Sequence, residues 1–541
     1  PERGYSKFGA YMVMEHNGDT SAAARALRNN GYGGRAEKEK KPTIEAPTEI
    51  PHLIPDSKKI LKALYRGQDG DAELFVELHK DRFLYDHADG YWYLWEWHQW
   101  RQDEIKKVVS ITTKVIDLYG KEIINQAKLM RAAAEAGDEK NAARANKRIG
   151  DLRKKIAQLH RLGHKKDVLQ LAAVGEGSLG ISGNEWNKDP WILGCKNGVI
   201  DLRTGVLRDG KQEDYIKSAS PVKWKGLDAP CLTWDAFLFD VFDGNIDLVA
   251  FLQRLLGYSI MGLNTEHIFP IFWGAGRNGK STLIETIHTV MGPDLSGPIK
   301  SEMLLDQGYV RSSAGPSPDI MALREKRIIW GSESNEGKSF DVSRVKWLVG
   351  GDALVGRAPH GPREITFSPS HTLFLLTNYC PRANSSDFAF WNRIHLIPFQ
   401  VAFVDSPEAP NQKQRDPQII KKLIAEASGI LGWLVRGCLQ WQKYGLMPPK
   451  EICDATGEYR NDNDDLGHFI EEECFVSPSV SVKPGMLWKK LEMWCENNGV
   501  KRISGKRLSK YLEDNYGIKA ERKGLGGIRT YSGIGVYADH E

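Results

Sequence analysis

The spacing of apolar positions changes along the chain and separates helical stretches from strand-forming ones. From about residue 53 to 262 the spacing is mainly helical, and the charged, alanine-rich stretch 103–171 predicts a helical hairpin with breaks near Gly137 and Gly150. The block 267–400 instead alternates short apolar runs with helical segments, which predicts a domain built on a parallel β-sheet. The pattern therefore indicates an α/β protein with a large helical region.

Three shorter patterns add detail. Residues 426–442 have the spacing of an amphipathic helix that ends near Gly445 and Pro448. Residues 197–205 alternate turn-forming and apolar residues, as a β-hairpin does. The aromatic run 91–100 alternates like a strand; its rings could stack on single-stranded bases, but we favour packing because aromatic side chains mostly supply core area.

Composition narrows the class of protein. The 541 residues suffice for about three or four domains, and a hydrophobic share of 41% is ordinary for a soluble protein. Seven scattered cysteines without a C-x-x-C pair indicate neither a disulfide framework nor a zinc site. No apolar run approaches the roughly 18 residues that span a bilayer, so we expect a soluble, cytoplasmic protein without membrane contact. The net charge of +4 is mild, so any nucleic-acid surface must be local.

The most specific chemical signal is a glycine-rich loop that directly follows the apolar run 268–273. Residues 274–281 read Gly-Ala-Gly-Arg-Asn-Gly-Lys-Ser and match the phosphate-binding pattern G-x-x-x-x-G-K-[ST]. In this pattern backbone N–H groups surround the phosphates of ATP, Lys280 reaches the β and γ phosphates, and the Ser281 hydroxyl ligates Mg²⁺. The helical spacing that follows adds an N-terminal dipole facing the phosphates. The expected nucleotide contacts are Gly274, Gly276, Asn278, Gly279, Lys280, Ser281 and Thr282.

Polar residues at the ends of later apolar runs are candidates to complete this site. Glu333 ends one run and would hold Mg²⁺ and polarise the attacking water, with Glu336 as an auxiliary acid. Asn378 ends another and would orient that water or contact the γ phosphate, although asparagine after a strand is often only a turn former. Arg393 precedes an apolar strand and would stabilise the transition state of a neighbouring subunit; a surface salt bridge is the alternative.

Two basic segments are candidate nucleic-acid contacts. Pro359, Gly361 and Pro362 predict a tight hairpin tip, and a protruding basic hairpin is suited to gripping a phosphate backbone. The basic residues around this tip are Arg357, His360 and Arg363.

The second basic segment is near the end of the chain. Between Gly485 and Thr530 it contains eleven Lys or Arg residues and five Asp or Glu residues. Two helices followed by two strands around Gly524 predict a winged helix that binds duplex DNA or, alternatively, docks a protein. The expected DNA contacts on its second helix are Lys506, Arg507 and Lys510.

The ordered motifs resemble the superfamily 3 helicase domain of phage, plasmid and poxvirus primase-helicases, over roughly residues 70 to 475. The motifs that carry the resemblance are G-A-G-R-N-G-K-S at 274, I-I-W-G-S-E at 328, K-W-L-V-G-G-D at 346, L-L-T-N at 375 and F-W-N-R-I-H-L-I-P-F at 390.

The resemblance implies an AAA+ ATPase that assembles as a homo-oligomeric ring, usually a hexamer, and moves 3′ to 5′ along DNA. It implies Lys280 and Ser281 for ATP and Mg²⁺, Glu333 for water activation, Asn378 as sensor and Arg393 as a finger acting across subunits. Many superfamily 3 members carry two adjacent acids at the strand end. Here Ser332 precedes Glu333, which leaves open the group that steadies Mg²⁺ beside Ser281.

The expected fold is therefore α/β: an AAA+ parallel-sheet core, a helical N-terminal oligomerisation region and a C-terminal winged helix. The start of the chain resembles a connector after a primase-polymerase domain, and no primase-type catalytic set is recognisable before residue 70, so we expect unwinding rather than priming. The expected domains are 1–52, connector and linker; 53–262, helical collar; 263–400, ATPase; 401–475, helical extension; and 476–541, winged helix.

Three functions are consistent with these residues. The main hypothesis is an ATP-dependent replicative helicase acting on single-stranded and forked DNA. A second is an origin-binding initiator or loader that uses ATP only as an assembly switch, and a third is a nonenzymatic scaffold led by the basic C-terminal module. Stimulation of ATP hydrolysis by single-stranded DNA separates the first from the second.

Overall fold

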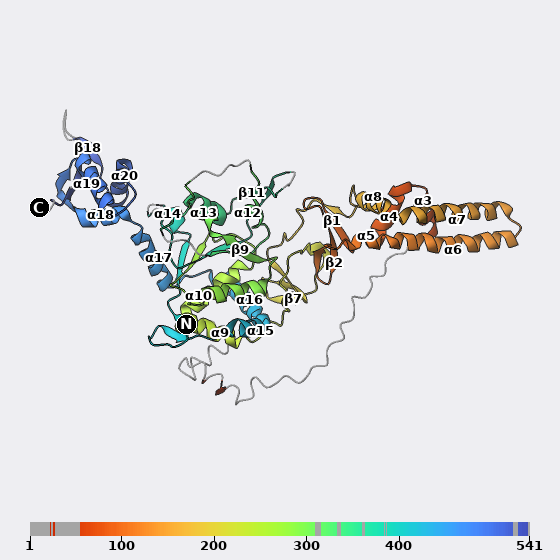
Figure 1. Ribbon diagram of the computed structural model, residues 1–541, viewed down its shortest axis with the longest axis horizontal. Coiled ribbons are helices and arrows are strands. Elements are labelled where there is room, and N and C mark those ends of the chain that lie inside the picture. The colour runs from red at the N-terminus through yellow and green to blue at the C-terminus, as the bar shows by residue number, and fades with distance from the viewer. Residues whose placement is uncertain are drawn as a thin grey trace. The chain divides into compact units, whose positions relative to one another are not determined.

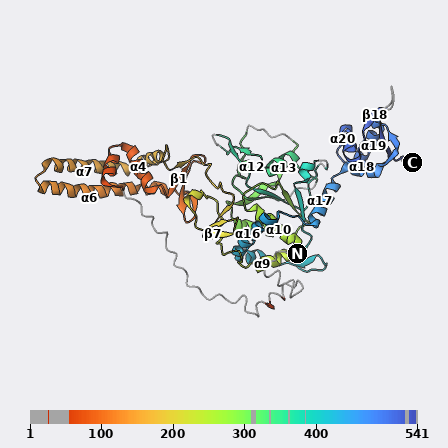
Figure 2. The same ribbon diagram turned by 180° about the vertical axis from the view of Figure 1, so that it is seen from behind.

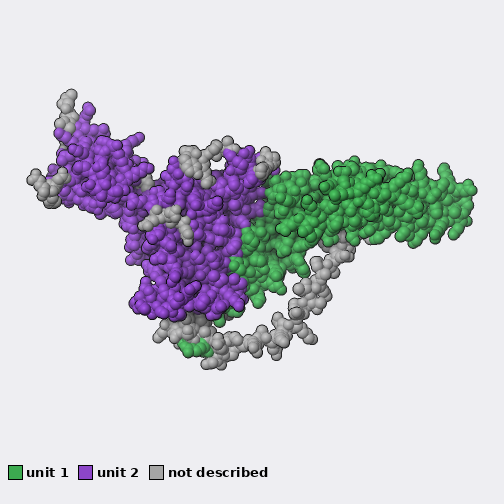
Figure 3. Space-filling view, viewed as in Figure 1, with its two compact units in different colours: residues 1–232, 289–295, 426–439 green, residues 233–288, 296–425, 440–541 purple. Residues whose placement is uncertain are grey.

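The computed structural model describes residues 55–308, 315–332, 337–359, 363–383, 385, 387–522 and 529–538, together with Ala22, Arg25 and Ala26. Helices and strands are numbered in chain order, and Figure 1 labels many of them. The chain divides into two compact units (Figure 3): unit 1 contains residues 1–232, 289–295 and 426–439, and unit 2 contains residues 233–288, 296–425 and 440–541. Apart from the three helical residues Ala22, Arg25 and Ala26, the predicted connector and linker over residues 1–52 lie outside the described residues.

Unit 1 contains the predicted helical hairpin, formed by α6 (Thr113–Glu135) and α7 (Glu139–Leu159). Its turn is at Gly137, and Asp138 caps α7 by accepting a hydrogen bond from the Asn141 N–H at 3.0 Å. The break predicted near Gly150 is wrong, because Gly150 lies inside α7. The burial of Ile149 and Leu152 around it offsets the cost of a helical glycine, which is about 1 kcal/mol. The other helices of this region are α3 (Ser57–Leu64), α4 (Gly67–His79), α5 (Lys107–Ile111) and α8 (Leu162–Ala172).

A buried carboxylate joins four of these helices. Asp71 on α4 is fully buried and accepts hydrogen bonds from the Tyr119 hydroxyl on α6 at 2.7 Å and from Lys155 Nζ on α7 at 3.1 Å. His164 Nε2 on α8 lies 2.9 Å from the same carboxylate. Lys155 is only 7% exposed and also donates to the Gly67 carbonyl at 3.0 Å. Each partner comes from a different helix, so this network fixes the base of the hairpin.

The aromatic run forms two strands of a four-stranded sheet with the order β3-β2-β1-β4. Packing is confirmed for Tyr93 and Trp100, which are buried with Trp186, whereas Tyr91 and Trp97 are exposed. The strands are β1 (Phe83–Asp86), β2 (Tyr91–Glu96), β3 (Gln99–Gln102) and β4 (Gly180–Ile181).

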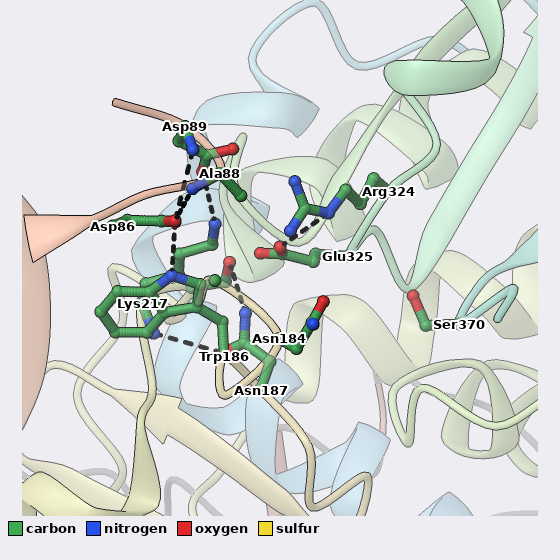
Figure 4. A network of polar contacts seen from close by, with 12 residues as sticks. Asp86, Ala88, Asp89, Asn184, Trp186, Asn187, Lys217, Arg324, Glu325 and Ser370 are labelled. Atoms are coloured by element: carbon green, nitrogen blue, oxygen red, sulfur yellow. Dashed lines mark hydrogen bonds and ion pairs between the residues drawn. The ribbon is translucent and has the colours of Figure 1, made fainter. Parts of the chain in front are cut away.

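Polar contacts hold this aromatic cluster in place (Figure 4). The Trp186 indole N–H donates to Asp86 Oδ2 at 2.7 Å. Lys217 Nζ bonds Asp89 Oδ2 at 3.1 Å and lies 5.5 Å from the centre of the Trp186 ring. The Lys217 ammonium group therefore contacts both a carboxylate and an aromatic ring within unit 1.

The hairpin predicted over 197–205 is confirmed within a three-stranded antiparallel sheet. Its strands are β5 (Ile192–Cys195), β6 (Gly198–Asp201) and β7 (Val206–Arg208), and the 3₁₀ helix η1 (Gln212–Asp214) follows.

The centre of unit 2 is a five-stranded sheet with the order β14-β8-β13-β10-β9. All neighbouring strands are parallel, which confirms the predicted parallel-sheet α/β domain. All six residues of β13 are buried. The strands are β8 (Phe269–Trp273), β9 (Ser296–Lys300), β10 (Ile328–Ser332), β13 (Thr372–Thr377) and β14 (Ile394–Pro398). Since these strands are parallel, the C-terminal ends of β8, β10 and β13 lie along the same side of the sheet.

The remaining elements from residue 232 to 462 are helices and two short strand pairs. The predicted amphipathic helix is confirmed as α16 (Ala427–Tyr444). The helices besides α16 are α9 (Leu232–Val241), α10 (Ile246–Ser259), α11 (Lys280–Met291), η2 (Ser301–Met303), α12 (Pro318–Met321), α13 (Val342–Val349), α14 (Phe388–Trp391), α15 (Ile419–Ala425) and α17 (Lys450–Asp462). The strand pairs are β11 (Leu354–Gly356) with β12 (Ile365–Phe367) and β15 (Ala402–Val404) with β16 (Gln412–Gln414). None of the helices that the structure describes has the length and apolar character needed to cross a bilayer.

The C-terminal module has a hydrophobic core of its own. It contains three helices and an antiparallel sheet with the order β17-β19-β18. Its core begins at Leu466 on α18, a helix that the boundary at residue 476 assigns to the preceding region. The apolar face of α18 packs into this module, and the sequence pattern alone did not show which neighbour would receive it. The elements are α18 (Asp465–Glu473), β17 (Cys474–Val482), α19 (Pro484–Asn497), α20 (Gly505–Tyr516), β18 (Ala520–Arg522) and β19 (Arg529–Val536).

Candidate nucleotide-binding site

The loop between β8 and α11 places glycine where a side chain would not fit. Gly279 has φ +87°, and a Cβ there would lie 2.9 Å from Val241 Cγ2. A Cβ at Gly274 would lie 2.2 Å from the carbonyl oxygen of Phe399. Any other residue at these two positions would displace the loop. The Leu283 N–H donates to the Gly279 carbonyl at 2.9 Å, so helical bonding begins directly where the loop ends.

Backbone carbonyls of the two flanking strands hold the loop. The Asn278 side-chain amide is 4% exposed and donates to the Phe399 carbonyl, just after β14, at 3.0 Å. The Gly274 N–H donates to the Thr377 carbonyl at the end of β13 at 3.3 Å. These anchors are not visible in the sequence, because a backbone acceptor leaves no residue-type signal.

Lys280 is buried at the first position of α11, with 6% of its surface exposed. Its Nζ donates to the Gly274 carbonyl at 2.7 Å, to Asn278 Oδ1 at 3.0 Å and to Asn378 Oδ1 at 3.1 Å. All three acceptors are neutral, and burial lowers the pKa of Lys280 to about 8. A buried cation whose partners among the described residues are all neutral is suited to receive an anion.

The strand register accounts for the meeting of Lys280 and Asn378. Thr377 pairs with Trp273, so Asn378 and the loop both begin where these neighbouring strands end. Ser332 pairs with Leu376 at the same edge. Glu333 comes next in the sequence but lies outside the described residues, as does Glu336.

Of the two residues predicted to bind Mg²⁺, Ser281 lies within the described part of the chain and Glu333 does not. Ser281 is exposed and Thr282 half-buried in the first turn of α11. The described part of the chain, which excludes Glu333, contains no cluster of three His, Cys, Asp or Glu side chains able to hold a metal ion. Ser281 fits one Mg²⁺ ligand by its hydroxyl and position, whereas the carboxylate partner stays a prediction.

Arg393 is not brought to Lys280. Strand β14 runs parallel to β8, with Ile394 opposite Phe269 and Pro398 opposite Trp273. Arg393 precedes β14, while the loop follows β8, so about 16 Å of strand separates the two positions. The Arg393 guanidinium donates to the Ala389 carbonyl. Within one chain, Arg393 and the loop therefore lie at opposite ends of the parallel strands.

Two of the three basic residues of the predicted hairpin are described, and both lie beside an antiparallel strand pair. Arg357 directly follows β11 and is half-buried, and its N–H donates to Ser317 Oγ at 3.0 Å. Arg363 lies just before β12 and is exposed, while His360 at the tip lies outside the described residues. The antiparallel pairing of β11 with β12 confirms the two strands of the hairpin. The predicted tip at Gly361 and Pro362 lies outside the described residues, and contact with DNA stays a prediction.

The three basic residues predicted on α20 do not share one environment. Lys506 and Lys510 are exposed one helical turn apart. Arg507 is half-buried and lies near Asp465 on α18. Burial raises the pKa of Asp465, and the nearby Arg382 and Arg507 counteract part of that rise. The structure thus separates Arg507 from the two exposed lysines.

A pocket of about 680 Å³ lies next to Asn378. Trp273 and Tyr379 line it from the strand ends, and Glu458 and Asp462 line it from α17. Asn378 is common to the pocket and to the contacts of Lys280, so the two adjoin. The pocket is not visible in the sequence, because α17 lies about 80 residues beyond Asn378.

Comparison with known proteins adds relatives to this geometry. Residues 72–243 match the family described as "D5 N terminal like". A protein of Acanthamoeba polyphaga mimivirus named as a "Putative helicase" is 26% identical over 469 residues, covering 82% of this chain and 47% of that protein. A "Putative helicase" of Invertebrate iridescent virus 3 is 27% identical over 316 residues, covering 53% and 32%. A "Putative primase" of African swine fever virus is 23% identical over 345 residues, covering 60% and 35%.

These matches confirm the resemblance to viral primase-helicases. The chain spans less than half the length of these curated relatives. Among solved structures, the apo C terminal region of NrS-1 is 15% identical with a TM-score of 0.35, covering 58% of this chain and 76% of that one.

Proposed function

We propose that this chain is the ATP-dependent helicase portion of a DNA-replication protein, of the AAA+ type and superfamily 3. The observation that carries the proposal is the meeting of Lys280 with Asn278 and Asn378 at the edge where β8 and β13 end. The parallel sheet and the similarity to viral proteins named as helicases support it. The arrangement of helices and strands from α18 to β19 supports a winged helix at the end of the chain.

The described side chains suit the binding and hydrolysis of ATP. Lys280 would exchange its three neutral acceptors for phosphate oxygens, with which a cation interacts more strongly. Ser281, at the start of α11, would hold Mg²⁺, which supplies positive charge to the phosphates when bound. Once Lys280 turns to the phosphates, the Asn378 amide is released to orient a water molecule. Glu333 would take the proton of that water.

The position of Arg393 supports a ring. An arginine at the far edge of the sheet does not serve the loop of its own chain, but in a head-to-tail ring it would face the site of the next copy. Such an arginine contributes roughly 10³ to 10⁵ in rate where fingers of this kind are known. A hexamer, 3′ to 5′ movement and a primase-polymerase domain preceding the chain belong to the proposal through the resemblance.

DNA would be held by the basic surfaces. Arg357, His360 and Arg363 around the β11–β12 hairpin would grip the phosphate backbone of the single strand inside the ring. Lys506 and Lys510 on α20 would contact the duplex ahead of the fork, with Arg507 fixing the helix from its buried side.

Mixed rings test the proposal. ATP hydrolysis and strand separation are measured on forked DNA for the unaltered protein, for Lys280→Ala, for Arg393→Ala and for mixtures of the two variants. Each variant alone is expected to be inactive, and mixtures should recover hydrolysis at interfaces that pair an intact loop with an intact arginine. If no mixing ratio restores hydrolysis, the shared site is wrong. If single-stranded DNA fails to stimulate hydrolysis while ATP still drives assembly, the protein is a switch rather than a helicase.

A further inference from the structure

The segment that follows Asn378 is bonded to the end of α17. The Ala383 N–H donates to Asn463 Oδ1 at 2.9 Å, and the Ser385 hydroxyl donates to Asp464 Oδ1 at 3.0 Å. Arg460 Nε donates to the Ser385 carbonyl at 3.2 Å, and the Tyr459 hydroxyl donates to the Pro381 carbonyl. The chain that carries Asn378 is therefore anchored on α17 within eight residues of it.

The second oxygen of Asp464 reaches the C-terminal module. The Tyr511 hydroxyl on α20 donates to Asp464 Oδ2 at 2.5 Å. Tyr511 is 8% exposed and Ser385 is 6% exposed, so both bonds lie where water competes little. Burial and the hydrogen bond to Asp464 raise the pKa of Tyr511, which keeps its hydroxyl a donor. Asp464 thus touches the segment after Asn378 with one oxygen and α20 with the other.

The local fold leaves Asp464 available for this bridge. Asp464 occupies the N-cap position of α18, where an aspartate usually accepts hydrogen bonds from its own helix, yet it makes no side-chain cap bond there. Gly467, one turn later, leaves the necessary room: a Cβ would lie 2.6 Å from Asp464 Oδ2 and 3.1 Å from the Tyr511 hydroxyl. The forgone cap and the glycine distinguish the bridge from an ordinary helix start. Figure 2 shows α17 leading into α18 at this junction.

We infer that Asp464 is a positioning residue that couples Asn378 to the C-terminal module. Through Ser385 it holds the segment that carries Asn378 against Lys280, and through Tyr511 it follows the position of α20. The exposed Lys506 and Lys510 are on the same helix as Tyr511. Duplex DNA that binds α20 and shifts it would therefore also shift the segment that carries Asn378. This inference rests on the proposed ATPase and adds a route by which DNA regulates it.

Single-hydroxyl variants test the bridge with little risk to folding. Tyr511→Phe removes the hydrogen bond from α20 to Asp464, and Ser385→Ala removes the hydrogen bond from the segment after Asn378 to Asp464. The control is Tyr531→Phe, because the Tyr531 hydroxyl contacts Ser509 inside the same module and not Asp464. The readouts are kcat and KM for ATP, with and without forked DNA. Hydrogen exchange of residues 378–383 is measured as well.

Ser385→Ala should lower kcat about fivefold with KM within about twofold, because Asn378 would act in the transition state rather than in binding. Tyr511→Phe should keep basal kcat and lose most of the response to forked DNA, whereas Tyr531→Phe should keep both. Hydrogen exchange of 378–383 should rise in the first two variants only. Asp464→Asn retains one acceptor oxygen. Its kcat, its response to forked DNA and its hydrogen exchange should lie between those of the unaltered protein and those of Asp464→Ala.

The outcomes separate the two proposals. If the unaltered protein hydrolyses no ATP, the proposed function fails, and hydrogen exchange still decides the coupling. If it hydrolyses ATP but Tyr511→Phe matches Tyr531→Phe in every readout, the coupling through Asp464 is overturned and the proposed function stands. A change in KM without a change in kcat for Ser385→Ala would also overturn the positioning role.

Discussion

Two lysines in this protein are almost equally buried but have opposite surroundings. Lys155 in unit 1 is 7% exposed and lies 3.1 Å from the buried carboxylate of Asp71. Lys280 in unit 2 is 6% exposed, and its partners are one carbonyl and two side-chain amides. Within the described residues, Lys280 forms no ion pair.

The difference separates a structural charge from a functional one. A buried cation beside a carboxylate is already neutralised, and its contacts hold four helices together. A buried cation beside neutral oxygens keeps the cost of its desolvation, which lowers the pKa of Lys280 to about 8. That cost is recovered when an anion arrives, so incomplete pairing marks the site that awaits a ligand.

The largest expected effect is on the paired lysine. Lys155→Met should lower the free energy of unfolding around α4 and α7 by about 3 to 5 kcal/mol, because it leaves Asp71 buried without its cation. Hydrogen exchange of these two helices measures the loss. Lys154→Met, on the exposed side of α7, should change it by less than about 0.5 kcal/mol. Equal effects of the two substitutions would contradict the structural role of the pair.

Lys280 should behave in the reverse way. Lys280→Met should lower ATP hydrolysis roughly 10²- to 10³-fold, while the nucleotide-free protein keeps its free energy of unfolding within about 1 kcal/mol. Steady-state kinetics and denaturant unfolding of the same sample measure both quantities. Lys421→Met, on the exposed surface of α15, is the control for losing one charge. A large loss of stability in Lys280→Met would make it a structural lysine like Lys155.

A neutral donor to the same carboxylate should matter less than the cation. Tyr119→Phe removes only the hydroxyl that donates to Asp71, which should cost about 1.5 to 3 kcal/mol. The measurement is hydrogen exchange of α4 and α6. A cost equal to that of Lys155→Met would mean that hydrogen bonding, rather than charge, holds the network.

The smallest expected effect is the pH dependence of nucleotide affinity. Because the pKa of Lys280 is about 8 rather than 10.5, its charge is lost as pH rises through 8. ATP affinity should therefore fall about tenfold between pH 7 and pH 9. Between pH 8 and pH 10.5 the Lys280 side chain is protonated in the unfolded chain but largely neutral in the folded one. The contribution of Lys280 to the stability of the nucleotide-free protein should therefore rise with pH over this range. Titration with a fluorescent nucleotide measures affinity, and Lys280→Arg, which stays charged, should show a flat profile.

Much of the fold was predictable because its signals are local. The α6–α7 hairpin follows from helical periodicity and the turn at Gly137, and the parallel sheet follows from alternating apolar runs and helices. The prediction of a break at Gly150 was wrong because a propensity cost of about 1 kcal/mol yields to packing. The boundary at residue 476 missed α18 because an apolar helical face does not reveal its partner.

The candidate site was predictable to the same extent. The glycine-rich loop is contiguous in sequence, so its residues and their backbone requirements are visible there. Asn378 was named from its place after a strand, but its contact with Lys280 depends on β13 pairing directly with β8. The roles proposed for Glu333 and Arg393 stay predictions.

The sequence by itself determined the chemical groups and the local elements, since glycine spacing, helical periodicity and strand-ending polar residues act over a few positions. Only the tertiary structure decided which of these groups meet. Strand order placed Asn378 beside Lys280, and the parallel direction of β14 placed Arg393 at the opposite end of the strands. Tertiary packing left Lys155 with a carboxylate and Lys280 without one among the described residues. The physical reason is that burial and charge pairing depend on neighbours distant in the chain, and these neighbours are defined only once the strands and helices have packed.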